Sequence, residues 1–175
     1  QSRRISTKIF RKKILMPLVS SKWLAENLNK VKIIDCSWHL PNSNRNSKEE
    51  FEKEHIKNAI YFDLDANSDQ NTDLPHMMPK KNLWENILSS MGISNEDEIV
   101  IYDNSDLFSS CRCWFTFIFF GHNEKLVHVL DGGLKKWKME NRPISQNKNE
   151  NKIINTKYTA TIKKEMIKNK LDIDL

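Results

Sequence analysis

The amino-acid sequence predicts an α/β fold in which about five short parallel strands are flanked by helices on both faces. Short β-rich runs alternate along the chain with amphipathic stretches, and this alternation is typical of a parallel sheet whose strands are joined by helices. A length of 175 residues allows one well-buried domain and leaves a modest remainder for tails. We therefore expect one folded α/β domain.

Five short runs are the candidate strands. They cover residues 18–20, 31–36, 59–62, 98–102 and 126–130. The helices are expected over residues 20–29, 47–55, 81–91 and 110–120, with a fifth around Trp137. Ser20 or Ser21 can cap the first helix and Ser47 the second, whereas Gly92 ends the third. Because apolar residues surround the fourth helix over 114–120, we expect it to be buried.

Residues 65–79 form a long polar loop that is closed by Pro75 and Pro79. Connections in compact domains usually have roughly 4–6 residues, and longer ones tend to carry function. We therefore expect this loop to contribute to a functional site.

The formal charge of +5 is concentrated at one end of the chain. The first 15 residues hold six basic side chains and no acidic one, so the remaining residues sum to −1. A nearly neutral body does not indicate a nucleic-acid surface. The longest apolar stretch, residues 114–120, is far shorter than the roughly 20 residues that cross a bilayer, so no membrane partner is expected either.

The two ends of the chain are expected to lie outside the folded domain, which we place at residues 16–145. Residues 1–15 are a basic extension or leader: either sequence upstream of a start at Met16, which we favour and which goes with a cytoplasmic location, or a mitochondrial transit peptide. Residues 146–175 hold few apolar positions. We interpret them as a linker toward a further domain.

Three cysteines are present, Cys36, Cys111 and Cys113. An odd number without a secretory signal argues against a disulfide scaffold and for a reducing compartment. Cys111 and Cys113 would point roughly 200° apart around a helix, so they cannot easily share a metal ion. Since no other Cys or His pair has ligand spacing, we expect neither a metal nor a cofactor.

Ordered motifs link this sequence to a known family. They are Leu18-Val19-Ser20, Asp35-Cys36-Ser37-Trp38-His39-Leu40-Pro41, Glu50-Phe51, His55-Ile56-Lys57-Asn58-Ala59, Tyr61-Phe62-Asp63-Leu64-Asp65, Leu74-Pro75-His76-Met77-Met78-Pro79, Tyr102-Asp103, Phe119-Phe120-Gly121-His122 and Asp131-Gly132-Gly133-Leu134. In this order they resemble the amino-terminal domain of the two-domain, rhodanese-type 3-mercaptopyruvate and thiosulfate sulfurtransferases. The resemblance covers residues 16–145 continuously.

The resemblance implies a rhodanese-like fold in two tandem domains, the second of which supplies a nucleophilic cysteine on a loop of backbone amides. Sulfur moves from a small anionic donor, mercaptopyruvate or thiosulfate, to that cysteine, and then to cyanide or to a thiol such as that of a thioredoxin-like protein. In this chain Asp103 stands at the cysteine position, and a carboxylate cannot accept sulfane sulfur. The chain is therefore expected to be the inactive half of a sulfurtransferase, with the missing carboxy-terminal rhodanese domain as its partner.

The resemblance also assigns a supporting role to Asp65 and His76. In mercaptopyruvate-type enzymes an Asp and a His of this domain lie on the rim of the shared cleft and are proposed to handle protons with a hydroxyl of the catalytic loop. Both matching residues lie in the loop 65–79, and a His beside a carboxylate is a suitable acid–base pair. The alternative is that Asp65 caps local backbone and His76 is an ordinary rim residue.

Two other functions stay open. Cys111 lies near the start of the helix expected at 110–120, where backbone amides favour a thiolate, so it could be the persulfide carrier of a stand-alone enzyme. A packing role at the helix start is the alternative for Cys111. The domain could instead be a non-catalytic module that binds another protein. Arg112 is a candidate for contact with a sulfonate or carboxylate, or for an ion pair at the helix start.

Overall fold

A computed structural model describes residues 17–146 and 154–168 of the chain. Its main sheet has five strands in the order β1-β6-β5-β2-β4, and every neighbouring pair is parallel. The strands are β1 (Leu18–Val19), β2 (Lys32–Asp35), β4 (Ala59–Tyr61), β5 (Ile99–Tyr102) and β6 (Val127–Leu130). The predicted parallel sheet is confirmed, and each strand lies within its expected range.

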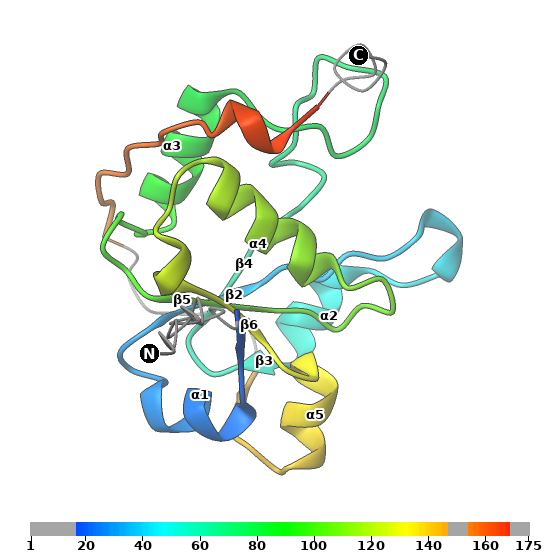
Figure 1. The fold of residues 1–175 in the computed structure, drawn as a ribbon. Coiled ribbons are helices and arrows are strands. Elements are labelled where there is room, and N and C mark those ends of the chain that lie inside the picture. The colour runs from blue at the N-terminus through cyan, green and yellow to red at the C-terminus, as the bar shows by residue number, and fades with distance from the viewer. Residues whose placement is uncertain (1–16, 147–153, 169–175) are drawn as a thin grey trace, which may run out of the picture.

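Five α-helices join or flank these strands. They are α1 (Ser21–Asn27), α2 (Ser47–Lys53), α3 (Lys81–Ser90), α4 (Ser109–Phe119) and α5 (Gly133–Met139). Short 3-10 helices cover Pro41–Ser43, Glu124–Leu126 and Lys164–Met166. In Figure 1, α3 and α4 lie above the sheet and α1 and α5 lie below it. The expected placement of helices on both faces is therefore confirmed.

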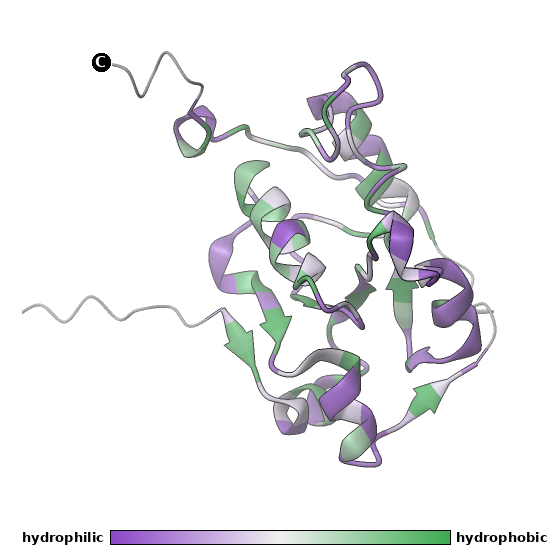
Figure 2. Ribbon diagram, turned by 90° about the vertical axis from the view of Figure 1, so that its right-hand side faces the viewer, coloured by the Kyte–Doolittle hydropathy of each residue, from purple (hydrophilic) through white to green (hydrophobic). Residues whose placement is uncertain are grey.

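The side chains of β5 show how the two faces of the sheet are buried. Ile99 and Ile101 pack with the apolar residues of α3 and α4, whereas Val100 and Tyr102 pack with those of α1, α2 and α5. All four are 0% exposed. Figure 2 shows the strands of the sheet as mainly hydrophobic. Successive side chains of a strand point to opposite faces, so a strand such as β5 that lies between two helical layers is apolar on both faces.

The structure also corrects the expected start and end of α2. Asn46, rather than Ser47, caps the helix: its Oδ1 accepts hydrogen bonds from the amides of Lys48 and Glu49 at 3.1 and 3.2 Å. The helix ends at Lys53 and does not reach His55. His55 instead begins β3 (His55–Ile56), which pairs antiparallel with β7 (Ile144–Ser145) in a two-stranded sheet that the sequence did not predict.

The segment 154–168 packs against the domain. Tyr158 and Ala160 are 3% and 1% exposed and belong to the core on the α3–α4 side. The amide of Thr161 donates to the carbonyl of Phe120 at 2.9 Å, and the Tyr158 hydroxyl lies 3.2 Å from His122 Nδ1. This part of the expected linker therefore contributes to the folded domain, whereas the extension 1–15 lies outside the described residues.

Across residues 17–146 and 154–168, no helix has the length and apolar character required to span a membrane. Over the same ranges, no group of three or more His, Cys, Asp or Glu side chains is arranged to hold a metal ion.

Candidate functional site

The loop between β4 and α3 brings Asp65 and His76 together. His76 Nε2 lies 2.7 Å from Asp65 Oδ1, although the two residues are 11 positions apart. The His76 side chain is 23% exposed and the Asp65 side chain 67% exposed. If Nε2 carries the proton that Asp65 accepts, the neutral ring has its lone pair at Nδ1. The arrangement is therefore a carboxylate-oriented histidine that a second molecule could reach.

Trp38 contacts both members of this pair. Its indole N–H donates a hydrogen bond to Asp65 Oδ2 at 2.9 Å, so the two carboxylate oxygens have different partners. The indole ring also packs edge-on against the His76 ring, with the centroids 4.7 Å apart and the planes at 87°. Trp38 therefore limits the rotation of the Asp65 carboxylate and of the His76 ring.

Arg112 holds the same loop from helix α4. Its guanidinium donates a hydrogen bond to the main-chain carbonyl of His76, a residue whose φ of 55° lies in the left-handed region. Burial lowers the pKa of Arg112. Among the described residues Arg112 forms this bond to backbone and no ion pair, and its contact with an anionic ligand stays a prediction.

Two surface hollows meet at Asp65. One, of about 260 Å³, is formed by the loop itself and includes His76. The other, of about 350 Å³, is lined by Trp38, Arg45 and Tyr61 among others. Asp65 therefore stands between two accessible surfaces, one of which is lined by the cationic side chains of Arg45 and Lys48.

The loop after β5 covers residues 103–109, the last of which begins α4, and it is where the sequence resemblance places the nucleophile of the family. Asp103 Oδ2 accepts a hydrogen bond from the amide of Ser110 at 2.7 Å, so this carboxylate occupies a donor at the start of α4. The main-chain carbonyl of Asp103 accepts from the amide of Leu134 at 3.0 Å. Gly133 makes this approach feasible, since a Cβ there would lie 2.5 Å from that carbonyl oxygen. Asp103 is therefore bound by its carboxylate to the start of α4 and by its main-chain carbonyl to the start of α5.

Cys111 is exposed and lines a hollow of about 340 Å³ together with Asp103 and Phe108. It lies far along the chain from Asp65 and His76 and is not among the residues that line their hollow. Cys36 and Cys113 are buried, and burial raises the pKa of the Cys36 thiol well above its usual range. Of the three cysteines, Cys111 alone is open to a solute.

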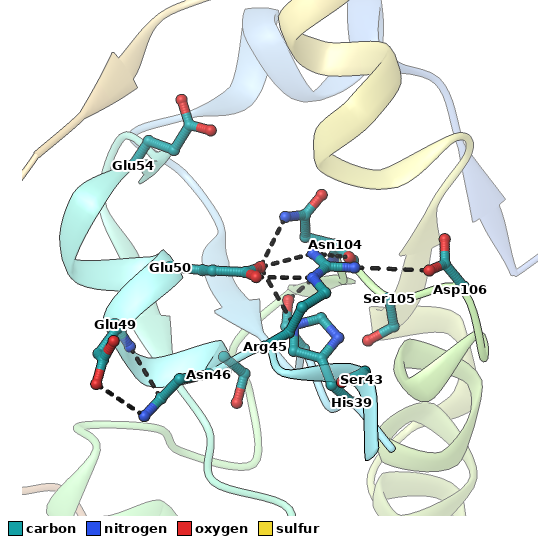
Figure 3. Close-up of polar contacts among 12 residues, drawn as sticks. His39, Ser43, Arg45, Asn46, Glu49, Glu50, Glu54, Asn104, Ser105 and Asp106 are labelled. Carbon is teal, nitrogen blue, oxygen red and sulfur yellow. Dashed lines mark hydrogen bonds and ion pairs between the residues drawn. The ribbon is translucent and has the colours of Figure 1, made fainter. Parts of the chain in front are cut away.

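A network centred on Glu50 joins α2 to the loop 103–109 (Figure 3). Arg45 donates two hydrogen bonds to the Glu50 carboxylate, each of 2.7 Å, and these bonds lower the pKa of Glu50. Asn104 Nδ2 donates to the same carboxylate at 3.0 Å, and His39 Nε2 lies 3.2 Å from it. The network ties a helix that precedes β4 to the loop that follows β5.

Sequence reasoning named Asp65, His76 and Cys111 but missed Trp38, Glu50 and Asn104. Trp38 and Glu50 both lie in motifs that carried the family resemblance, so a signal was present. Asn104 had no such signal apart from its place in the loop after Asp103. Its partner Glu50 is 54 positions away, and only the tertiary fold brings the two together.

Comparison with known proteins defines the class. The rhodanese-like domain family matches residues 20–140, and the chain belongs to that family. Thiosulfate/3-mercaptopyruvate sulfurtransferase 1, mitochondrial, of Arabidopsis thaliana is 45% identical over 124 residues, which cover 70% of this chain and 32% of the relative. The 3-mercaptopyruvate sulfurtransferase of Mus musculus is 37% identical over 164 residues, which cover 89% of this chain and 54% of that protein.

Among solved structures, SseA from Escherichia coli, described as a 3-mercaptopyruvate sulfotransferase with the rhodanese fold, superposes with a TM-score of 0.82 and 28% identity. The match covers 90% of this chain and 60% of SseA. The expected rhodanese fold is thus confirmed, and the relatives are sulfurtransferases of the mercaptopyruvate and thiosulfate types. The chain spans about a third to a half of the length of the curated relatives.

Proposed function

We propose that this chain is the non-nucleophilic amino-terminal half of a two-domain sulfurtransferase. That enzyme moves sulfane sulfur from 3-mercaptopyruvate or thiosulfate to a thiol or to cyanide. The proposal rests on Asp103, which follows β5 at the position that the resemblance assigns to the cysteine of the family and accepts a hydrogen bond from the amide of Ser110. The small share of each relative that the chain covers supports a second domain.

In the proposed reaction the thiolate of the second domain attacks the sulfur of mercaptopyruvate. A sulfur–sulfur bond forms, the carbon–sulfur bond breaks, and its electron pair remains on pyruvate enolate, which takes up one proton. With thiosulfate as donor, sulfite leaves instead. The persulfide then passes its outer sulfur to an acceptor thiol, for which a thioredoxin-like protein is our proposed partner.

Asp65 and His76 would handle the proton in this scheme. Oriented by Asp65 at 2.7 Å, His76 can accept a proton at Nδ1 while the donor binds and return one when the enolate leaves. The partial exposure of the pair suits a site that a second domain would cover. Closure by that domain would remove water and strengthen the Asp65–His76 interaction.

The test compares variants of the chain continued into the coding sequence after Leu175. Asp65→Asn and His76→Ala should each lower kcat for pyruvate release by roughly 100-fold, the scale of general acid–base catalysis. Glu26→Gln, an exposed carboxylate on α1 that lines neither hollow at Asp65, is the control and should keep wild-type kcat. A stop codon directly after Leu175, or wild-type kcat in both site variants, would contradict the proposal.

A second candidate function rests on the exposure of Cys111. If the 175-residue chain is itself a persulfide carrier, thiosulfate treatment should add one sulfur atom, and Cys111→Ser should abolish the adduct. Our main proposal predicts no adduct in either protein. Intact-protein mass spectrometry separates the two outcomes.

For location we propose the cytoplasm, with mitochondria as the alternative, since one plant relative is named as mitochondrial. Residues 1–15 decide between the two. A fluorescent fusion that carries these residues should stay cytoplasmic, and import into mitochondria would instead identify them as a transit peptide.

A further inference from the structure

We propose that the loop 103–109, which holds no cysteine in this chain, has become a support for the Asp65–His76 pair and acts through Trp38. Trp38 is then a positioning residue, and Ser105 is the loop residue that fixes it. The inference rests on the proposed function, because it assigns a purpose to the geometry of that pair. It concerns residues outside the Asp65–His76 pair itself.

The first contact in this chain of interactions joins Ser105 to the main chain of Trp38. The Trp38 amide donates to Ser105 Oγ at 2.8 Å, and Ser105 Oγ donates to the Trp38 carbonyl at 2.5 Å. One hydroxyl therefore satisfies both main-chain groups of the same residue. This double contact is made across 67 positions of sequence and fixes the backbone of Trp38 relative to the loop.

Neighbouring residues hold the loop itself in place. Ser109 Oγ lies 2.9 Å from Ser105 Oγ and donates to the carbonyl of Cys36 at 2.6 Å. The amide of Asn104 donates to Ser37 Oγ at 2.8 Å. Figure 3 shows Asn104 and Ser105 beside the Glu50 network, which binds the Asn104 side chain. The loop is therefore joined to the segment 36–38 on one side and to α2 on the other.

The second contact runs from the Trp38 side chain to the pair. The indole N–H bonds Asp65 Oδ2, and this bond leaves Oδ1 directed at His76 Nε2. The edge of the indole also limits the tilt of the His76 ring. If the N–H is lost, the exposed carboxylate can rotate, and Nε2–H loses the partner that selects its tautomer.

Phenylalanine at position 38 would keep much of the packing and remove only the donor. Trp114 offers a matched control, because it is also partly buried against the same core and also donates its indole N–H, to the carbonyl of Val127 at 3.2 Å. Trp114→Phe therefore costs one comparable hydrogen bond far along the chain from Asp65. If only Trp38→Phe alters the Asp65–His76 pair, the effect comes from the contacts of Trp38 and not from the loss of a tryptophan in general.

The experiment measures the tautomer of His76 by long-range 1H–15N correlation in the 15N-labelled 175-residue chain, with His76→Ala to assign the signals. Wild type and Trp114→Phe should show the Nε2–H form at high pH. Trp38→Phe and Ser105→Ala should show a mixture of both tautomers, and Ser105→Thr, which keeps the hydroxyl, should restore the wild-type pattern. Dispersed backbone spectra for each variant would show that it has folded.

A wild-type tautomer pattern in folded Trp38→Phe would overturn the inference. If Trp38→Phe does not fold, the same pattern in folded Ser105→Ala would overturn it as well. In the chain continued past Leu175, Trp38→Phe should lower kcat by roughly 10- to 100-fold with little change in KM, whereas Trp114→Phe should not.

The two proposals can fail separately. If His76→Ala leaves kcat unchanged while Trp38→Phe alters the His76 tautomer, the proposed role of His76 in catalysis is wrong and the positioning role of Trp38 remains. If His76→Ala lowers kcat but Trp38→Phe changes neither the His76 tautomer nor kcat, the positioning role of Trp38 is wrong and the proposed function remains.

Discussion

Asp35, at the end of β2, gives the sharpest stability prediction. The side chain is buried, and burial raises its pKa from 3.8 to about 6, although hydrogen bonds from Ser37 and Tyr102 favour the carboxylate and oppose the rise. The nearby charge of Asp103 also raises this pKa. Ser37 Oγ donates to Asp35 Oδ1 at 2.6 Å and accepts from the amide of Asn104. Asp35 is therefore linked through Ser37 to the loop 103–109.

The sign of the effect follows from proton binding. Between about pH 4 and pH 6 the unfolded chain has lost the Asp35 proton while the folded chain still holds it, so stability falls as pH rises through this window. A pKa that moves from 3.8 to about 6 corresponds to roughly 3 kcal/mol at pH 7. Because the group is almost fully buried, solvent screening does not reduce this value much.

The variant Asp35→Asn removes the titration and keeps an oxygen that can accept from Ser37. Its free energy of unfolding should be close to wild type at pH 4 and should exceed wild type by roughly 3 kcal/mol at pH 7. Urea unfolding followed by tryptophan fluorescence at pH 4, 5, 6 and 7 measures the difference, in which other titrating groups largely cancel. A difference that is constant with pH, or that falls as pH rises, would refute the reasoning.

Three further changes test the packing around the site by urea unfolding. Glu50→Gln should cost about 1–2 kcal/mol, because one of the two oxygens that accept from Arg45 becomes an NH2 group and the other loses its charge, and an unchanged midpoint would mean that the network contributes nothing. Gly133→Ala should cost about 2 kcal/mol or more, since its φ is 52° and the new Cβ would meet the Asp103 carbonyl oxygen at 2.5 Å; a neutral result would contradict this close approach. Tyr158→Ala should cost about 3 kcal/mol by loss of a buried aromatic ring, and a loss below about 0.5 kcal/mol would show that the segment 154–168 does not pack on the domain.

The main sheet could be predicted because each of its strands lies in a short run of mostly apolar residues. β5 is the clearest case, since all four of its residues are buried and a strand covered on both faces must be apolar. The strands β3 and β7 have two residues each, too few to show any periodicity. The predicted cap of α2, Ser47, was wrong by one position. Asn46 and Ser47 are both good capping residues, and only local backbone geometry selects between them.

The candidate site could be predicted only in part. The family resemblance named Asp65 and His76, and the structure places their side chains 2.7 Å apart. No sequence pattern indicated that Trp38 binds Asp65 across 27 positions or that Ser105 holds Trp38 across 67. Contacts of this kind depend on which loops the sheet brings to one edge, and that arrangement exists only in the folded chain.

The central claim is that this chain supplies half of a sulfurtransferase site and lacks the nucleophile. Its most direct test is pyruvate release from mercaptopyruvate, measured side by side for the 175-residue chain and for the chain continued past Leu175. The account predicts turnover by the longer protein and only background for the shorter one. Turnover by the 175-residue chain alone would contradict it, because this chain would then carry a nucleophile of its own. Cys111 would be the first residue to test.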